Sequence, residues 1–153
     1  MWTRDELIAI ARPTARAHGL DEALFCALVE QESSWSPWAI RFEPGFYARY
    51  ENTLHLLPET ERYARAFSWG LCQVMGQTAR ELGWQGSMTQ LCEPLIGLEY
   101  GARKLRKCYP EELPSIPNFE EAPQAVHSLA LSHYNGGGNP NYAIEVLARV
   151  KNY

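Results

Sequence analysis

The sequence predicts a single, mainly α-helical domain. Apolar residues recur at helical intervals along most of the 153-residue chain, and glycines or prolines end these segments. No stretch shows the strict alternation of apolar and polar residues that is typical of a large sheet, and no internal repeat is present. A chain of this length can bury roughly two thirds of the surface that it exposes when unfolded. We therefore expect one domain, residues 1–153, with a hydrophobic core.

Two helices are expected before residue 34. Residues 3–6, Thr-Arg-Asp-Glu, have the spacing of a capping box, and the helix that begins there is expected to reach about residue 18, with a kink or a break at Pro13. Asp21 is a candidate N-cap for the second helix. That helix is expected to end in the turn that contains Glu32, because residues 33–37, Ser-Ser-Trp-Ser-Pro, have the composition of a loop.

The rest of the chain alternates helical patterns with breaks. Between Trp38 and Phe67 the pattern is mixed and fits short strands or a helix; we favour an irregular wall, followed by a helix over about 58–66. Residues 109–123 contain four prolines and are expected to form a surface loop within the single domain. Further helices are expected over residues 77–82, 94–108, 124–134 and 140–151.

The composition argues against several classes of partner. The net charge is −4, and the densest basic run, residues 103–107, is expected to be the solvated face of a helix, so no nucleic acid is expected. No window is long and apolar enough to span a membrane, so stable membrane insertion is not expected. The four cysteines show neither a Cys-X-X-Cys pair nor a spacing with histidine that is typical of zinc. We expect no metal ion, no cofactor and no obligate protein partner.

Three polar clusters occur where the helical pattern is interrupted. They are Glu32-Ser33, residues 70–75 (Gly-Leu-Cys-Gln-Val-Met) and residues 134–136 (Tyr-Asn-Gly). Glu32 stands at the negative end of its helix, followed by an aromatic-rich loop, and both surroundings oppose ionisation of a carboxyl group. Glu32 is therefore a candidate general acid. A single glutamate at a helix end is more commonly a surface charge, so the other two clusters decide its interpretation.

In this order, the three clusters resemble the motifs of lytic transglycosylases of the soluble (SLT) type, a family related in fold to goose-type lysozyme. Residues 31–35, Gln-Glu-Ser-Ser-Trp, match the Glu-Ser motif that carries the catalytic acid. Residues 70–75 are similar to the Gly-Leu-Met-Gln-Ile-Met motif that lines the glycan groove, with Cys72 in place of methionine. Residues 134–136 match the Ala-Tyr-Asn-Ala-Gly region. The resemblance implies a lysozyme-like domain with a groove.

The resemblance also implies the reaction and its site. Glycan strands of peptidoglycan would be the substrate, cleaved at the β-1,4 bond between N-acetylmuramic acid (MurNAc) and N-acetylglucosamine (GlcNAc) to leave 1,6-anhydro-MurNAc ends. Glu32 would protonate the leaving oxygen and then, as a carboxylate, take a proton from the MurNAc 6-hydroxyl. The residues implied to contact the substrate are Ser33, Gln73, Met75, Tyr134 and Asn135.

Two alternatives remain open. Residues from about 39 to 66 form an insertion relative to the family's usual spacing, and either Glu43 or Glu51 within it is a candidate second carboxylate. Such a group could hold a water and make the protein a muramidase, which hydrolyses the same bond; both residues could equally be plain loop charges. The alternative from another class is a non-catalytic cell-wall-binding or virion structural module.

The start of the sequence lacks the apolar core of a signal peptide. We therefore expect synthesis in the cytoplasm and action on the cell wall, in the periplasm or outside the cell. Delivery would follow holin-type release or association with a virion, as for a phage or prophage lysin. Residues 41–44, Arg-Phe-Glu-Pro, also resemble a segment of muramidase-type phage lysins.

Overall fold

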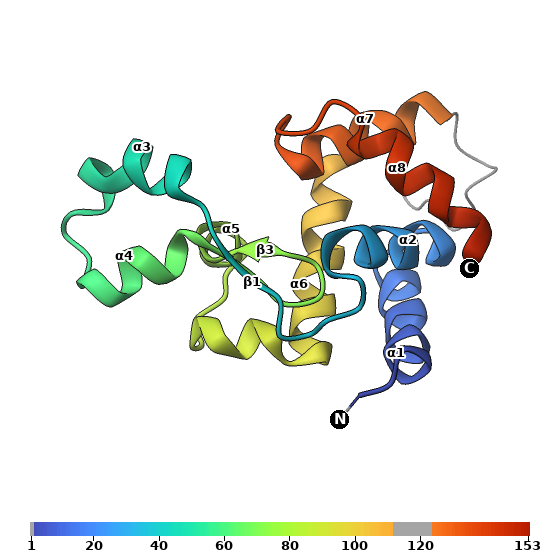
Figure 1. Ribbon diagram of the computed structural model, residues 1–153, viewed down its shortest axis with the longest axis horizontal. Helices are drawn as coiled ribbons and strands as arrows, with labels where there is room; N and C mark the ends of the chain where they lie inside the picture. Colours follow the sequence, from blue (N-terminus) through green and yellow to red (C-terminus); the bar gives the residue numbers. More distant parts are fainter. Residues whose placement is uncertain (1, 112–123) are drawn as a thin grey trace.

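The computed structural model describes residues 2–111 and 124–153, and helices dominate it (Figure 1). Three short strands form one small sheet. The helices are α1 (Arg4–Ala17), α2 (Glu22–Ser33), α3 (Pro44–Leu54), α4 (Glu59–Arg65), α5 (Gly76–Glu81), α6 (Pro94–Cys108), α7 (Gln124–Asn135) and α8 (Tyr142–Arg149), with 3-10 helices η1 (Met88–Cys92) and η2 (Val150–Asn152). The strands are β1 (Ile40–Phe42), β2 (Phe67–Trp69) and β3 (Val74–Met75). The mainly α class expected from the sequence is confirmed.

Local capping sets where the first two helices begin. The Thr3 hydroxyl accepts from the Glu6 backbone N–H while the Glu6 carboxylate accepts from the Thr3 N–H at 2.8 Å, which completes the predicted capping box. Helix α1 continues through Pro13 as one element, so a break there is excluded. Asp21 caps α2, because its carboxylate accepts from the Leu24 N–H at 2.7 Å.

Helix α2 runs through the centre of the molecule. Its residues 24–29 are all fully buried, and α1 and α8 pack against it. Its two ends approach the surface, and the last turn carries Glu32. The helix ends where Ser34 and Trp35 adopt left-handed backbone conformations, with φ of 51° and 65°. The Trp35 indole N–H donates to the Tyr153 hydroxyl at 2.7 Å, which ties this end of α2 to the last residue of the chain.

The sheet is antiparallel in the order β1-β2-β3. Arg41 pairs with Ser68, and Ser68 pairs with Met75, so these three side chains form one row across the sheet. Because side chains alternate between the two faces of a strand, this row shares one face while Phe42 and Phe67 share the other. The β2–β3 turn requires Gly70, since a Cβ there would lie 2.3 Å from the Leu91 carbonyl oxygen.

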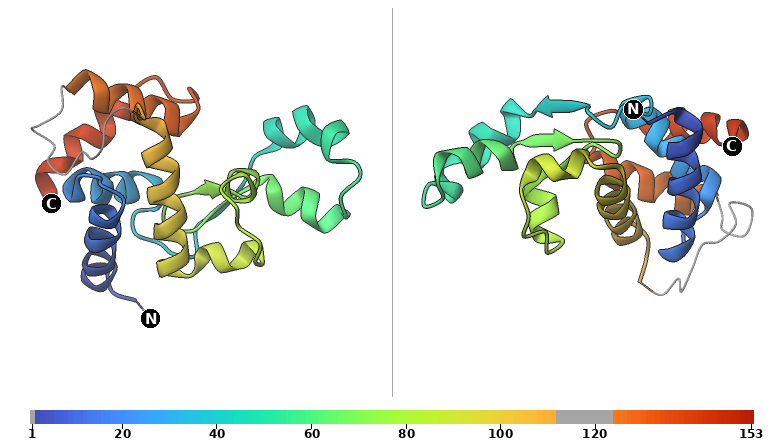
Figure 2. Two further views of the ribbon diagram at one scale, coloured as in Figure 1. Left: turned by 180° about the vertical axis from the view of Figure 1, so that it is seen from behind. Right: turned by 90° about the horizontal axis from the view of Figure 1, so that it is seen from below.

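Helices α3 and α4 project away from the other helices, with the sheet between them and the rest, as all views show (Figures 1 and 2). The helix predicted over about 58–66 is found as α4, whereas the irregular wall favoured for the preceding segment is wrong over residues 44–54, where the helical alternative forms α3. Pro44 begins α3 at a position where a missing N–H costs nothing. The Tyr47 ring then stacks on the Tyr63 ring at 4.7 Å between centroids, which joins α3 to α4. We call these two helices the arm.

Several sequence-based expectations reach beyond the described residues. The proline-rich loop lies mostly in 112–123, outside them; of its start, Tyr109 is buried and its hydroxyl is 2.9 Å from His127 Nδ1. The fold leaves the predicted single domain over residues 1–153 untested, and it stays a prediction.

Over residues 2–111 and 124–153, no helix combines the length and the apolar character that crossing a bilayer requires.

Candidate active site

Glu32 lies in the last turn of α2, partly buried in the wall of a pocket. One of its carboxylate oxygens, Oε1, accepts a hydrogen bond from the hydroxyl of Tyr142, the first residue of α8. Burial raises the pKa of Glu32, and this effect outweighs the Tyr142 hydrogen bond and the nearby charge of Lys104, which both lower it. The direction agrees with the one expected from the sequence, and desolvation in the pocket wall is its main cause.

The pocket has a volume of about 310 Å³ and draws on both the helical part and the sheet. Five of the predicted site residues line it, and so does Glu43 of the insertion. The five are Glu32, Gln73, Met75, Tyr134 and Asn135. Six further residues complete the lining: Arg41, Ser68, Thr78, Lys104, His133 and Gly136. The fold thus brings the three motifs to one pocket.

The row of side chains across the sheet forms one wall of this pocket. Arg41, Ser68 and Met75 all line it, as their shared face requires. Glu43 directly follows β1, and its Oε1 accepts from Arg41 Nε at 2.8 Å and from the Ser68 hydroxyl at 3.0 Å. Glu43 therefore faces the pocket with one oxygen already engaged. Glu51, the other candidate second carboxylate, lies in α3, and its side chain is outside the described residues.

Gln73 holds the turn between β2 and β3. Its φ is 45°, and its side-chain N–H groups donate to the carbonyl oxygens of Ala39 at 3.0 Å and Gly70 at 2.9 Å. Both amide protons are therefore used by the backbone. Only the amide oxygen is left to contact a ligand in the pocket. In the predicted sugar contact, Gln73 would therefore accept a hydrogen bond from the sugar.

The side chains of Tyr134 and Asn135, at the end of α7, form hydrogen bonds with backbone groups. The Tyr134 hydroxyl donates to the Cys72 carbonyl at 2.7 Å, and burial raises the pKa of Tyr134 well above its ordinary value. With its oxygen turned to the following loop, the Asn135 amide accepts from the N–H groups of Gly138 at 3.1 Å and Asn139 at 2.8 Å. These bonds join α7 to the Gly-Leu-Cys-Gln turn and fix the loop that leads to α8.

Ser33 is the predicted contact residue that does not line the pocket. Its hydroxyl donates to the Val29 carbonyl of its own helix at 3.2 Å. The neighbouring acid Glu30 points to another face of α2, where Arg4 lies 3.4 Å away and the Tyr153 hydroxyl donates to it at 2.9 Å. The side chains of Ser33 and Glu30 therefore lie outside the pocket that contains Glu32.

Sequence reasoning missed several residues of this site, and two of them, Tyr142 and Lys104, bear most directly on Glu32. Tyr142 follows Asn139-Pro140-Asn141, so its place at the start of a helix was foreseeable, but its partner on α2 was not. Lys104 belongs to the basic run that was expected to be a solvated face, and for this residue the expectation is wrong. Its side chain lines the pocket, and its Nζ lies 3.7 Å from the centroid of the Tyr134 ring.

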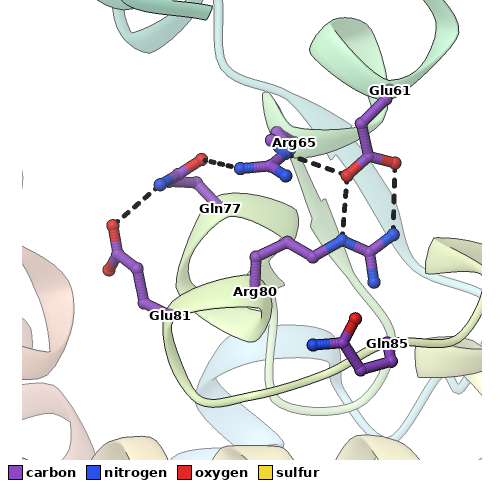
Figure 3. Close-up of a pocket in the computed structure, with 6 residues that line it drawn as sticks. All are labelled: Glu61, Arg65, Gln77, Arg80, Glu81 and Gln85. Carbon is purple, nitrogen blue, oxygen red and sulfur yellow. Dashed lines mark hydrogen bonds and ion pairs between the residues drawn. The ribbon is translucent and has the colours of Figure 1, made fainter. Parts of the chain in front are cut away.

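A second, more open depression lies between α4 and α5, and polar side chains that line it form hydrogen bonds with one another (Figure 3). The Glu61 carboxylate accepts from Arg80 at 2.8 and 3.1 Å and from Arg65 at 2.9 Å. Arg80 also donates to the carbonyl oxygens of Trp84 and Gly86 at 2.7 and 2.9 Å. This network anchors the arm to α5 and the loop after it, and we assign it a structural role.

Comparison with known proteins identifies the family. Residues 10–146, which contain all three motifs, match the model of the transglycosylase SLT domain. A membrane-bound lytic murein transglycosylase C from Mannheimia succiniciproducens is 24% identical, over 94% of this chain and 37% of that protein, so the chain spans little more than a third of that relative. No solved structure matches significantly. The resemblance noted from the motifs and the lysozyme-like, mainly α class are confirmed, and the chain belongs to the SLT transglycosylase domain family.

Proposed function

We propose that this domain is a lytic transglycosylase that cleaves the β-1,4 bond between MurNAc and GlcNAc of peptidoglycan. The observation that carries the proposal is the placement of Glu32. Its carboxyl group lies in a pocket lined by residues of all three family motifs, and burial raises its pKa. A carboxyl group that keeps its proton at higher pH is suited to act as a general acid.

The first step is proton donation to the leaving oxygen. Tyr142 donates to Oε1 of Glu32, so the other oxygen carries the transferable proton. As the bond from the MurNAc C1 to the oxygen breaks, that oxygen takes the proton and Glu32 becomes a carboxylate. The substrate acetamide helps to stabilise the oxocarbenium-like centre.

The second step regenerates the acid. The MurNAc 6-hydroxyl oxygen bonds to C1, and its proton returns to the Glu32 carboxylate. No water is consumed, and no second carboxylate is required, in contrast to the glycosidases that work with paired carboxyl groups. The products are a GlcNAc end and a 1,6-anhydro-MurNAc end.

Purified protein and cell-wall sacculi test this proposal. Release of muropeptides with anhydro ends, detected by liquid chromatography and mass spectrometry, is expected from the wild type. Glu32→Gln should lower the rate by about two orders of magnitude or more. Glu30→Gln is the matched control, because Glu30 lies two residues away on another face of α2 and outside the pocket. A Glu32→Gln protein that keeps full activity would exclude Glu32 as the acid.

One observation favours the muramidase as second candidate. Glu43 lines the same pocket as Glu32, held by Arg41 and Ser68, so a carboxylate is available to hold a water. The products separate the two reactions, since anhydro ends are lighter by one water than hydrolysed ends. If the wild type leaves reducing ends and Glu43→Gln does not, hydrolysis is established. If Glu43→Gln still leaves anhydro ends, the transglycosylase reaction is established.

The non-catalytic module makes a different prediction. Wild type and Glu32→Gln would then sediment equally with sacculi, and neither would release muropeptides. Action at the cell wall follows from the proposed substrate, whereas release through a membrane lesion, carriage in a virion and a phage origin stay predictions. Expression in a bacterial cytoplasm, with and without a membrane-permeabilising agent, tests the first route, which predicts lysis only when the agent is present.

A further inference from the structure

Lys104 stands apart from the other basic residues of α6. Its neighbour Arg103 pairs with Glu99 at 2.7 Å, and Lys107 is exposed. The Lys104 side chain instead reaches the pocket that contains Glu32, and its Nζ lies 3.7 Å from the centroid of the Tyr134 ring. In the part of the chain that the structure describes, no carboxylate forms an ion pair with it.

An ammonium group in a partly buried pocket wall needs compensation. Burial lowers the pKa of Lys104, and the negative charge of Glu32 is the largest influence that raises it again. The face of the Tyr134 ring adds a second attraction, since an aromatic face carries partial negative charge. The Tyr134 hydroxyl is fixed to the Cys72 carbonyl, so the ring cannot swing away from beneath Nζ without breaking a buried hydrogen bond.

Among the lysines and arginines that line the pocket in the described part of the chain, Lys104 is the one with no ion pair to a carboxylate. Arg41 also lines the pocket, but it is paired with Glu43 at 2.7 Å. Among the described residues, the titratable and charged groups that line this pocket or interact with Glu32 are Tyr142 from α8, Lys104 from α6, Arg41 from β1, Glu43 before α3, His133 and Tyr134 from α7, and the buried thiol of Cys72.

We propose that Lys104 is a positioning residue for the acid: its ammonium, held over the Tyr134 ring, stabilises the Glu32 carboxylate that remains after proton transfer. The inference rests on the proposed function of Glu32. In the first step the proton leaves Glu32 for the leaving oxygen, and a negative charge appears in a poorly solvated wall. Lys104 lies there before the charge forms, so no group has to move to meet it.

Direct titration of Glu32 tests the proposal without any assay of activity. Carbon-13 NMR of the glutamate side-chain carboxyl carbons, assigned with Glu32→Gln, gives the titration midpoint of Glu32. In Lys104→Met the midpoint should rise by about one pH unit, because removal of a nearby opposite charge disfavours the carboxylate. Lys104→Arg, which keeps the cation, should stay close to wild type. Lys107→Met is the matched control on the same helix and should leave the midpoint unchanged.

The reciprocal titration covers the case in which Lys104→Met does not fold. Because coupling between two sites is mutual, removal of the Glu32 charge must move the Lys104 titration by the same amount in the opposite direction. In Glu32→Gln the lysine carbon-13 signal of Lys104 should therefore titrate at lower pH than in wild type. An unchanged midpoint in either folded variant would overturn the proposal.

The pH dependence of cleavage then distinguishes a positioning role of Lys104 from a purely structural one. Activity requires protonated Glu32, so it is lost as pH rises through the pKa of Glu32. Lys104→Met should move this alkaline limb to higher pH by the same shift as the NMR midpoint. A lower rate at every pH with an unmoved limb would show a structural role only. If Glu32 and Lys104 are coupled by NMR but no muropeptide is released, the proposed function fails while the coupling stands.

Discussion

The hydroxyl of Tyr142 donates a hydrogen bond to Oε1 of Glu32 and so joins the start of α8 to the end of α2. The two residues are separated by most of the chain, yet the bond fixes one carboxyl oxygen. The first prediction concerns this bond. Tyr142→Phe should raise the pKa of Glu32 further, because the hydrogen bond lowers it.

The kinetic consequence of Tyr142→Phe is a lower rate with an alkaline limb at higher pH. Loss of a hydrogen bond to a charged group should reduce the turnover number by about tenfold or more. The measurement is the pH–rate profile of muropeptide release. Tyr50→Phe, an exposed tyrosine of the arm, serves as control and should behave as wild type. Equal rates for Tyr142→Phe and wild type would show that the bond does not contribute.

The second prediction concerns close packing behind the pocket. A Cβ at Gly101 would lie 2.2 Å from Cys72 Sγ and 2.4 Å from Cys72 Cβ, both in the core. Gly101→Ala should therefore lower the free energy of unfolding by roughly 1–3 kcal/mol through overpacking. Gly45→Ala in α3 is the control, since nothing lies within 4 Å of its added Cβ and alanine favours helix. Urea denaturation of both variants checks the contrast.

The third prediction concerns the Tyr153 hydroxyl, which accepts from Trp35 Nε1 at 2.7 Å and from Arg4 at 2.8 Å and donates to Glu30. Tyr153→Phe removes this hub and leaves the N–H of the buried Trp35 without its partner. The free energy of unfolding should fall by about 1–3 kcal/mol. Thermal and urea denaturation measure it, with Tyr50→Phe again as control. An unchanged stability would mean that water replaces the hydroxyl at no cost.

The fourth prediction concerns pH and the arm. The hydrogen bond from Arg80 is the largest influence on the pKa of Glu61 and, together with the hydrogen bond from Arg65, lowers it below its ordinary value of 4.5 against the opposing effect of burial. A carboxyl group with a lowered pKa in the folded state contributes stability above its unfolded pKa, and this contribution is lost as pH falls through the folded pKa. Stability should therefore decrease below about pH 4.5, and less steeply in Glu61→Gln.

The control for Glu61 is Glu59→Gln, an exposed glutamate of the same helix. Its stability should follow the wild-type pH dependence over the same range. Urea midpoints measured at several pH values between neutrality and the acid limit give the comparison. Identical slopes for Glu61→Gln and wild type would place the acid sensitivity elsewhere in the protein.

Most of the helices could be predicted because the signals for them are local. The capping residues Thr3 and Asp21 and the opening Pro94 all act within a few residues of themselves, and the helices they begin are found as expected. Helix α3 could not be predicted in the same way. It is joined to α4 by aromatic stacking of Tyr47 on Tyr63, a contact between residues sixteen positions apart that no local spacing reports.

The sequence by itself determined the family, the order of its motifs and the choice of Glu32 as the candidate acid, since each rests on residue type and spacing along one segment. Only the tertiary structure decided what surrounds that acid. Tyr142 of α8 bonds to Glu32 and Lys104 of α6 lines the same pocket, whereas Ser33 turns back to its own helix although it is next in the chain. The polarity around a carboxyl group depends on neighbours in space, and those are set by long-range packing of helices.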